Sequence, residues 1–251
     1  MVKVSIIVPV YNAGKYVGDT LRSVQAQTLT DYEVLIVDDN SCDDSAVIIE
    51  SFCSTDSRFS LVRNNFNSGA AKCRNQMIQL SRGRYIAFLD ADDLWHPDKL
   101  RLQILAMQAS NSVMSCTAVD VIDGNGAVLG VRSVPDKITY DVLAKRTPIV
   151  NSTVVVDVHG VGSVSVPDIR RRQDFALWLK LIREHGSALG VSQCLASYRV
   201  HSESLSRNKL ISAFYTWKVF RDVERVPFFC ALYYFSFYSL KGVFARLRGL
   251  N

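Results

Sequence analysis

Four apolar runs in this sequence are each followed by a short polar segment whose residue types could bind a nucleotide or a metal ion. The segments are Tyr11-Asn12, Asp38-Asp39-Asn40-Ser41, Asn67-Ser68-Gly69 and Asp90-Ala91-Asp92-Asp93. Carboxylates bind a phosphate only through a divalent cation, so Asp90 and Asp92 predict Mg²⁺ or Mn²⁺ held by one or two carboxylates and by substrate phosphates. Taken alone, Asp-x-Asp is equally typical of a solvated turn or a helix cap.

The apolar runs themselves predict the scaffold that would bring these segments together. Strands are expected at 4–10, 33–38, 59–63 and 85–90, and helices at 15–25, 43–52, 69–80 and 98–108. This alternation is typical of an α/β fold with a mostly parallel sheet flanked by helices. Ligands bind beyond the carboxyl ends of the strands in such sheets, so the polar segments are expected to share one site.

The rest of the chain predicts a different organisation. We expect a strand at 113–123, a turn at Asp123-Gly124-Asn125-Gly126 that joins it to a second strand, and irregular loops to about residue 172. A helix at 173–185, short strands near 189–191 and 196–200, and helix from 205 almost to the end should follow. These elements divide the chain into a catalytic domain, 1–204, and a helical C-terminal appendage, 205–251.

Composition and motifs exclude several classes of protein. With 48% hydrophobic and 21% charged residues, the chain can bury one large core. No G-x-G-x-x-G or G-x-x-x-x-G-K-[ST] motif occurs, which argues against dinucleotide-binding and P-loop proteins. Six widely spaced cysteines indicate reduced thiols of a cytosolic protein rather than a zinc site or disulfides. The net charge of +5 arises from the tail, so nucleic acid is not an expected partner.

Four segments, in this order along the chain, resemble the family 2 glycosyltransferases of the GT-A fold. They are residues 4–12, 34–41, 69–75 and 85–93, and the resemblance covers roughly residues 2–205. It implies an inverting transferase that moves one sugar from a nucleotide-sugar donor, a UDP-hexose or UDP-N-acetylhexosamine, to an acceptor hydroxyl. Residues 1–112 would then bind the donor and 113–204 the acceptor.

The resemblance also implies roles for individual residues of the donor half. Asp39 would accept a hydrogen bond from uracil N3–H, and Asp92 would bind Mn²⁺ or Mg²⁺. The other implied donor contacts are Pro9, Tyr11 and Asn12 on the base, Arg74 near the base and ribose, and Asp90 on the ribose or sugar. Tyr11 as ordinary packing, Arg74 as a surface cation and Asp38 as a capping carboxylate are the alternatives.

On the acceptor side, the resemblance points to a carboxylate at the start of a helix. Inverting transfer needs a base for the acceptor hydroxyl, and family members commonly place Glu-Asp there. This chain has Gln173-Asp174, which leaves Asp174 as the candidate base, or as a helix cap. The preceding Arg170-Arg171-Arg172 is equally consistent with a diphosphate or anionic-acceptor site and with a solvated loop.

Two further features bear on the reaction. Tyr198-Arg199-Val200-His201 resembles a late motif of non-processive family members, in which the histidine lies near the diphosphate and metal, although a lone histidine is as often structural. The Q-x-x-R-W motif of the processive synthases is absent. The sequence therefore predicts addition of a single sugar, with a metal-dependent phosphotransferase or phosphohydrolase and a non-catalytic nucleotide-binding module as alternatives.

The C-terminal segment combines aromatic residues with cations. From residue 199 onward there are nine Lys/Arg and three acidic residues, and twelve aromatic residues lie between 214 and 244. This composition is typical of helices that lie on an anionic membrane surface. We therefore expect a peripheral protein on the cytoplasmic face of the membrane, acting on a lipid-linked saccharide in bacterial surface polysaccharide synthesis. A helical hairpin packed on the catalytic domain or on a second copy in a homodimer is the alternative.

Overall fold

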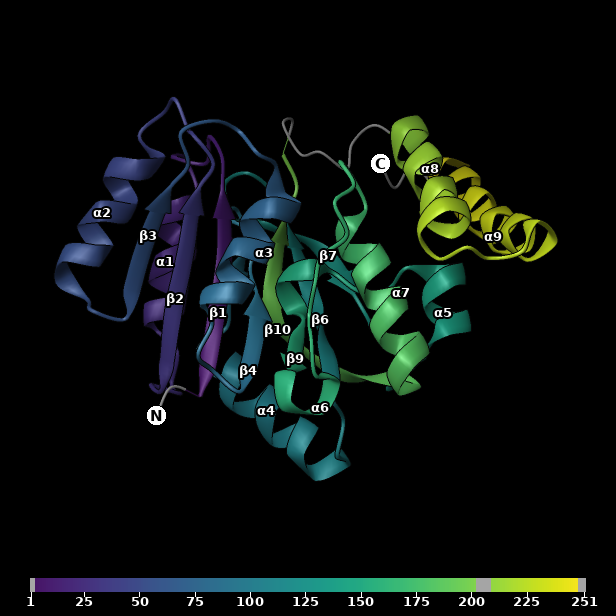
Figure 1. Ribbon diagram of the computed structural model, residues 1–251, viewed down its shortest axis with the longest axis horizontal. Coiled ribbons are helices and arrows are strands. Elements are labelled where there is room, and N and C mark those ends of the chain that lie inside the picture. Colours follow the sequence, from purple (N-terminus) through teal and green to yellow (C-terminus); the bar gives the residue numbers. More distant parts are fainter. Residues whose placement is uncertain (1–2, 202–208, 248–251) are drawn as a thin grey trace.

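The computed structural model describes residues 3–201 and 209–247, which form a three-layer α/β structure with helices on both faces of one sheet (Figure 1). The described strands make a ten-stranded sheet in the order β3-β2-β1-β4-β9-β6-β10-β5, with β7 added on β6 and β8 on β10. The α/β fold class predicted from the sequence is confirmed.

The first half follows the expected alternation, with boundaries that differ by a few residues. Its elements are β1 Val4–Val10, α1 Val17–Gln25, β2 Tyr32–Asp38, α2 Ser45–Thr55, β3 Phe59–Arg63, α3 Ala70–Leu80, β4 Tyr85–Phe88, β5 Leu94–Trp95 and α4 Lys99–Ser110. Strands β1, β2, β3 and β4 pair in parallel. The two-residue strand β5 is an element that the apolar pattern did not predict.

The second half is more regular than the sequence suggested. It contains β6 Met114–Ile122, β7 Val128–Arg132, β8 Lys137–Thr139, α5 Tyr140–Arg146, the 3₁₀ turn η1 Asn151–Thr153, β9 Val155–Asp157, α6 Val158–Val161, α7 Gln173–His185 and β10 Ser187–Arg199. The expectation of irregular loops to residue 172 was wrong for residues 137–161, because β8, α5, β9 and α6 are too short to show periodicity and the two strands form by pairing with distant strands. Residues 162–172 contain no helix or strand, as expected. The two strands expected near 189–191 and 196–200 are one strand, β10, whose register shifts around Cys194.

Side chains alternate between two cores, one on each face of the sheet. Ile6 and Val8 of β1 face α1, α2 and α4, whereas Ile7 faces the opposite core. Helices α3, α5 and α7 cover that opposite core. This period of two explains why the central strands read as continuous apolar runs.

One edge of the sheet collects the carboxyl ends of strands that are far apart in sequence. Strand β9 is antiparallel to both β4 and β6, and β6 is parallel to β10, so β4, β6 and β10 run in the same direction. Strand β1 is parallel to β4, which brings its end to the same edge. The segments after β1, β2, β4 and β10 therefore lie along the upper edge of the sheet in Figure 1.

The C-terminal segment forms helices that pack on the catalytic part of the chain. They are α8 Lys209–Lys218, the π-helix η3 Val219–Val223 and α9 Phe228–Leu247, drawn in yellow beyond α5 and α7 in Figure 1. Phe220 is buried, with its ring 5.8 Å from that of Phe175 in α7. Among the described residues, no helix has the length and apolarity required to cross a membrane. The expected boundary at 204–205 lies outside the described residues.

Candidate active site

The acidic loop, Asp90–Asp93, follows β4 at the edge where the strand ends meet, and its three aspartates have different partners. The Asp90 carboxylate accepts hydrogen bonds from Arg74 Nη2 at 2.7 Å and from Asn151 Nδ2 at 2.8 Å. Asp92 Oδ2 lies 2.9 Å from His201 Nε2. Asp93 is buried and accepts hydrogen bonds from the Ser152 hydroxyl and the Arg199 backbone amide. The loop therefore contacts α3, η1 and the end of β10 at once.

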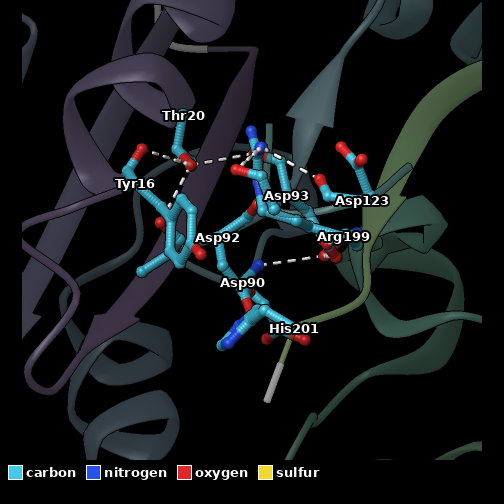
Figure 2. Close-up of polar contacts among 11 residues, drawn as sticks. Tyr16, Thr20, Asp90, Asp92, Asp93, Asp123, Arg199 and His201 are labelled. Atoms are coloured by element: carbon cyan, nitrogen blue, oxygen red, sulfur yellow. Dashed lines mark hydrogen bonds and ion pairs between the residues drawn. The ribbon is translucent and has the colours of Figure 1, made fainter. Parts of the chain in front are cut away.

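Tyr16 and Arg199 complete the surroundings of the Asp92–His201 pair (Figure 2). The Tyr16 ring lies 5.0 Å from the His201 ring and 4.8 Å from the Arg199 guanidinium. Arg199 Nε also donates to the backbone oxygen of Asp92 at 2.8 Å. These contacts come from α1, the acidic loop and β10, and they fix the position of His201 relative to Asp92.

Burial shapes the protonation of the acidic loop. Burial raises the pKa of the Asp92 carboxyl, as does the nearby Asp90 charge, while the contact with His201 lowers it. Burial also raises the pKa of Asp93 well above its ordinary value, and the charges of Asp92 and Asp90 add to this effect. A concentration of negative charge in a buried loop is the environment in which a divalent cation is most favourable.

The loops after β1 and β2 hold one another through hydrogen bonds. Asn12 Oδ1 accepts a hydrogen bond from the Cys42 backbone amide at 2.9 Å, and the backbone amide of Asn12 donates to Ser41 Oγ at 2.9 Å. Asn12 has φ 49°, in the left-handed region that asparagine tolerates better than most residues. The side-chain oxygen of Asn12 therefore orients these two loops. Tyr11, the preceding residue, is 53% exposed. Pro9 lies within β1, where it pairs with Val37 of β2.

Asp39 is hydrogen-bonded to the segment that connects β3 to α3. Its carboxylate accepts hydrogen bonds from Asn64 Nδ2, from the Ser68 hydroxyl and amide, and from the Gly69 amide, at 2.7–2.9 Å. Burial opposes ionisation of Asp39, but the hydrogen bonds from Ser68, Asn64 and Gly69 outweigh it and lower its pKa. Three of the four donors meet Oδ1, so Oδ2 is the oxygen with capacity for a further donor.

Three buried polar atoms at this edge have no hydrogen-bond partner in the described part of the protein. They are Asp38 Oδ1, Arg74 Nε and Asn151 Oδ1. The other carboxylate oxygen of Asp38 accepts from the Ser41 amide at 3.3 Å, within the loop after β2 and four residues before α2 begins. A buried polar atom without a partner costs free energy, and such atoms gather where a ligand completes the hydrogen bonding.

Asp174 lies in the first turn of α7, and this helix is held next to the donor half. Asn75 of α3 exchanges two hydrogen bonds of 2.8 Å with the backbone of Val166, in the segment leading to α7. Trp178, one turn after Asp174, packs edge-on against Phe88 of β4 at 4.8 Å. The half-buried Asp174 carboxylate has no hydrogen bond or ion pair among the described residues.

The residues present fit a divalent cation that is shared with substrate. Asp92 and His201 supply one oxygen and one nitrogen ligand 2.9 Å apart, a donor set that Mn²⁺ accepts. In the part of the chain that the structure describes, no group of three His, Cys, Asp or Glu side chains is arranged as a metal site. Substrate phosphates would have to provide the remaining ligands, as Mg²⁺ and Mn²⁺ commonly require.

The structure also brings in residues that sequence analysis did not select. Tyr16, Asn151 and Ser152 contact the acidic loop or His201 from segments that contain no recognised motif. The polar run Asn151-Ser152-Thr153 directly before the buried strand β9 is the one signal that could have been noticed. Asp93 and Arg199 lie inside motifs that were recognised but were given no role.

Known structures share this fold. Staphylococcus aureus TarS 1–349 in complex with UDP-GlcNAc superposes with a TM-score of 0.74 over 88% of this chain and 65% of that chain, at 19% identity. The mannosyltransferase PcManGT from Pyrobaculum calidifontis, in complex with GDP-Man and Mn²⁺, gives a TM-score of 0.68 over 90% and 65% of the two chains, at 18% identity. The fold is that of the GT-A glycosyltransferases.

Sequence relatives identify the family. Residues 5–162 match Glycosyl transferase family 2, and this chain belongs to that family. It is 39% identical over 245 residues, 97% of each chain, to the Bacillus subtilis protein named "Putative teichuronic acid biosynthesis glycosyltransferase TuaG". It is 34% identical over 241 residues, 96% of this chain and 93% of the other, to the Escherichia coli UDP-Glc:alpha-D-GlcNAc-diphosphoundecaprenol beta-1,3-glucosyltransferase WfgD. The protein is a glycosyltransferase.

Proposed function

We propose that this glycosyltransferase transfers one sugar, with inversion, from a UDP-sugar to a hydroxyl of a lipid-linked saccharide. The observation that carries the proposal is the convergence of Asp92 and His201 at the strand edge, together with the Asp174 carboxylate on α7, which has no partner among the described residues. The first two groups suit a metal-bound diphosphate, and the third suits an acceptor hydroxyl.

The donor would lie along the loops after β1, β2 and β4. Asp39 Oδ2 has capacity to accept the N3–H of uracil, and Tyr11 is exposed beside it to contact the base. Arg74 and Asn151 hold the Asp90 carboxylate, whose exposed surface can accept hydroxyl groups of the ribose or sugar. Asp92 and His201 would hold Mn²⁺ or Mg²⁺, which offsets the charge of the departing diphosphate.

Asp174 would act on the acceptor. An attacking hydroxyl must lose its proton as it bonds to the anomeric carbon on the face opposite the leaving group. A single displacement of this kind inverts the anomeric configuration. The carboxylate of Asp174, in the first turn of α7, would accept that proton.

The relatives support a role in the synthesis of bacterial surface polysaccharides. One carries a name in teichuronic acid biosynthesis, and another is named for transfer from UDP-Glc to GlcNAc on diphosphoundecaprenol. An acceptor on a lipid would be met at the cytoplasmic face of the membrane. The cationic and aromatic C-terminal helices would hold the enzyme there, with residues 205–251 as a membrane-contacting appendage.

Donor turnover distinguishes this function from its rivals. The purified protein is incubated with UDP-glucose, UDP-galactose or UDP-N-acetylglucosamine and Mn²⁺, with and without EDTA and an acceptor. Metal-dependent release of UDP supports the transferase, release of inorganic phosphate indicates a phosphohydrolase, and UDP binding without turnover indicates a non-catalytic module.

Asp174→Asn tests the proposed base. It should retain donor affinity and lower the turnover number by about 10²–10⁴-fold, the range for loss of a general base. The anomeric configuration of the wild-type product, read by NMR, should be opposite to that of the donor. A retained configuration would contradict single displacement and the role of Asp174. Glu184→Gln, at the other end of α7, serves as the charge-matched control.

A further inference from the structure

The turn η1 contacts the acidic loop on both sides of Asp92. Ser152 Oγ accepts a hydrogen bond from the Asp90 amide at 3.0 Å and donates to Asp93 Oδ2 at 2.5 Å. Asp90 is two residues before Asp92 and Asp93 is one residue after it. A single buried hydroxyl therefore joins the two ends of the segment that carries Asp92.

The same hydroxyl is linked to β10, the strand that ends two residues before His201. The second oxygen of Asp93 accepts the Arg199 amide at 2.9 Å, and Arg199 is two residues before His201. Arg199 Nε also donates a hydrogen bond to the Asp92 backbone oxygen at 2.8 Å. The path from Ser152 through Asp93 to Arg199 thus connects both members of the Asp92–His201 pair.

Ser152 is itself held rigidly. Its backbone oxygen accepts Trp95 Nε1 at 2.7 Å, and Gln103 Nε2 of α4 donates at 2.8 Å to the backbone oxygen of the next residue, Thr153. Both Ser152 and Thr153 are buried. A hydroxyl held in this way by packed elements can determine where a loop lies, rather than adapt to it.

We propose that Ser152 is a positioning residue of the active site, whose hydroxyl holds the acidic loop so that Asp92 and His201 converge on one divalent cation. This inference rests on the proposed function, because it assumes that this pair binds the cation. Loss of the hydroxyl would remove one hydrogen bond from each end of the segment and leave the Asp93 carboxylate with the Arg199 amide as its one donor among the described residues.

Ser5 offers a matched control. It is also buried, donates its hydroxyl to a buried carboxylate, Glu33 Oε1, at 2.6 Å, and accepts a backbone amide, that of Gly83, at 2.9 Å. It lies near the amino end of β1, at the opposite edge of the sheet from the acidic loop. Ser5→Ala and Ser152→Ala therefore remove the same kinds of interaction, but only the second change is near the proposed cation site.

The test measures bound radiolabelled UDP by equilibrium dialysis over a series of Mn²⁺ concentrations, together with the urea midpoint of each variant. Ser152→Ala should need about 10–100-fold more Mn²⁺ for half-maximal UDP binding, the range for loss of a group that orients a metal ligand. Ser5→Ala should lower the urea midpoint by a similar amount and leave the Mn²⁺ requirement within about twofold of the wild type, since no metal ligand is near it. Ser152→Thr, which retains the hydroxyl, should restore the Mn²⁺ requirement.

An unchanged Mn²⁺ requirement in Ser152→Ala, or an equal increase in Ser5→Ala, would overturn the inference. If Ser152→Ala does not fold, Asp93→Asn replaces one of the two acceptor oxygens by a donor at nearly constant shape, so the side chain can no longer accept from both Ser152 and Arg199, and it should raise the Mn²⁺ requirement likewise. Wild-type protein that binds UDP independently of Mn²⁺ and Mg²⁺ would refute the metal site of the proposed function and this inference with it. A wild type that needs Mn²⁺ and a Ser152→Ala that needs no more would refute the inference alone.

Discussion

At the scale of single residues, the three aspartates of the acidic loop should be distinguishable by their partners. Asp90 is paired with Arg74, Asp92 faces His201, and Asp93 is closed off by Ser152 and the Arg199 amide. Only Asp92 combines partial exposure with a second potential metal ligand. Under the proposed function, Asp90 would contact substrate and Asp92 would bind the cation, whereas Asp93 supports the loop from within.

Asp92→Asn should abolish metal-dependent UDP binding and lower turnover by at least about 10²-fold, because a metal ion supplies several kcal/mol of charge stabilisation. The amide keeps the shape of the side chain but loses the charge that attracts the cation. Isothermal titration with UDP in Mn²⁺ and in EDTA, followed by initial rates, measures both effects. Asp19→Asn removes an exposed carboxylate paired with Arg22 and is the control. Turnover of Asp92→Asn near the wild-type rate would exclude the assignment.

The sequence predicted this site unevenly, for a physical reason. Asp90 and Asp92 are close in the chain and follow a recognisable strand, so their proximity could be predicted without the fold. Asn151 contacts Asp90 at a separation of 61 residues in the sequence, and Ser152 contacts Asp93 at a separation of 59. His201 contacts Asp92 at a separation of 109. The family resemblance supplied His201, but nothing local identified the serine and asparagine, whose roles depend on how β9 inserts between β4 and β6.

At the scale of elements, the first half of the chain contains elements with a local sequence signal, whereas several elements of the second half depend on distant segments. Apart from the two-residue strand β5, the strands and helices before residue 112 form apolar runs and amphipathic segments whose alternation could be predicted from the sequence. Strands β8 and β9 have three residues each and are defined by neighbours from elsewhere in the chain. In β10, the pairing register with β6 shifts at the polar residues Ser192-Gln193. The apolar pattern is interrupted there, so the sequence predicted two short strands instead of one.

Helix α4 contains a buried cation with a measurable consequence for stability. Lys99 is fully buried, its ammonium lies 4.2 Å from the Trp95 ring centroid, and it donates to Gln103 Oε1 at 2.9 Å. Burial lowers its pKa from 10.5 to about 7. Between these values the unfolded chain binds a proton that the native protein does not, so stability should rise with pH over this window.

Lys99→Met should remove this contribution. From pH 7 to 9.5 the wild type should gain about 1–3 kcal/mol of unfolding free energy relative to the variant, since one pKa unit corresponds to about 1.4 kcal/mol. Below pH 7 both states of the wild type hold the proton, and the difference between the two proteins should become constant. Urea denaturation at several pH values measures it. Parallel pH profiles for the two proteins would show that Lys99 keeps an ordinary pKa in the native state and would contradict this prediction.

At the scale of the whole molecule, the C-terminal helices are both a packing element and an exposed apolar surface. Val219, Phe220 and Ala231 are buried in the core that α5 and α7 share, and Glu224 of the same segment pairs with Arg183 of α7 at 2.5 Å. The side chains of Phe214, Phe228, Phe229 and Leu232 are nonetheless 48–82% exposed. Removal of the helices would uncover the core, so truncation cannot separate packing from membrane contact.

Substitution of the exposed residues separates the two roles. Phe229 is 82% exposed, and the basic helices around it carry most of the net positive charge. Phe229→Ser should weaken co-sedimentation with liposomes that contain anionic lipid by about tenfold or more, because burial of a phenylalanine contributes about 1.5–3 kcal/mol. Leu129→Ser, at a residue of β7 that is 64% exposed, removes comparable apolar surface elsewhere and should bind as the wild type does.

Salt should act on this binding in a defined way. The electrostatic attraction of the helices to anionic lipid is screened as ionic strength rises, whereas the apolar contribution remains. Wild-type binding should therefore loosen in high salt without vanishing, and Phe229→Ser should lose most of its residual binding under the same conditions. Both variants should keep the wild-type melting temperature within about 2 °C, since exposed substitutions change stability little. If the wild type does not bind anionic liposomes at low salt, or if Phe229→Ser and Leu129→Ser bind them equally well, the C-terminal helices only pack on the catalytic part of the chain and do not contact the membrane.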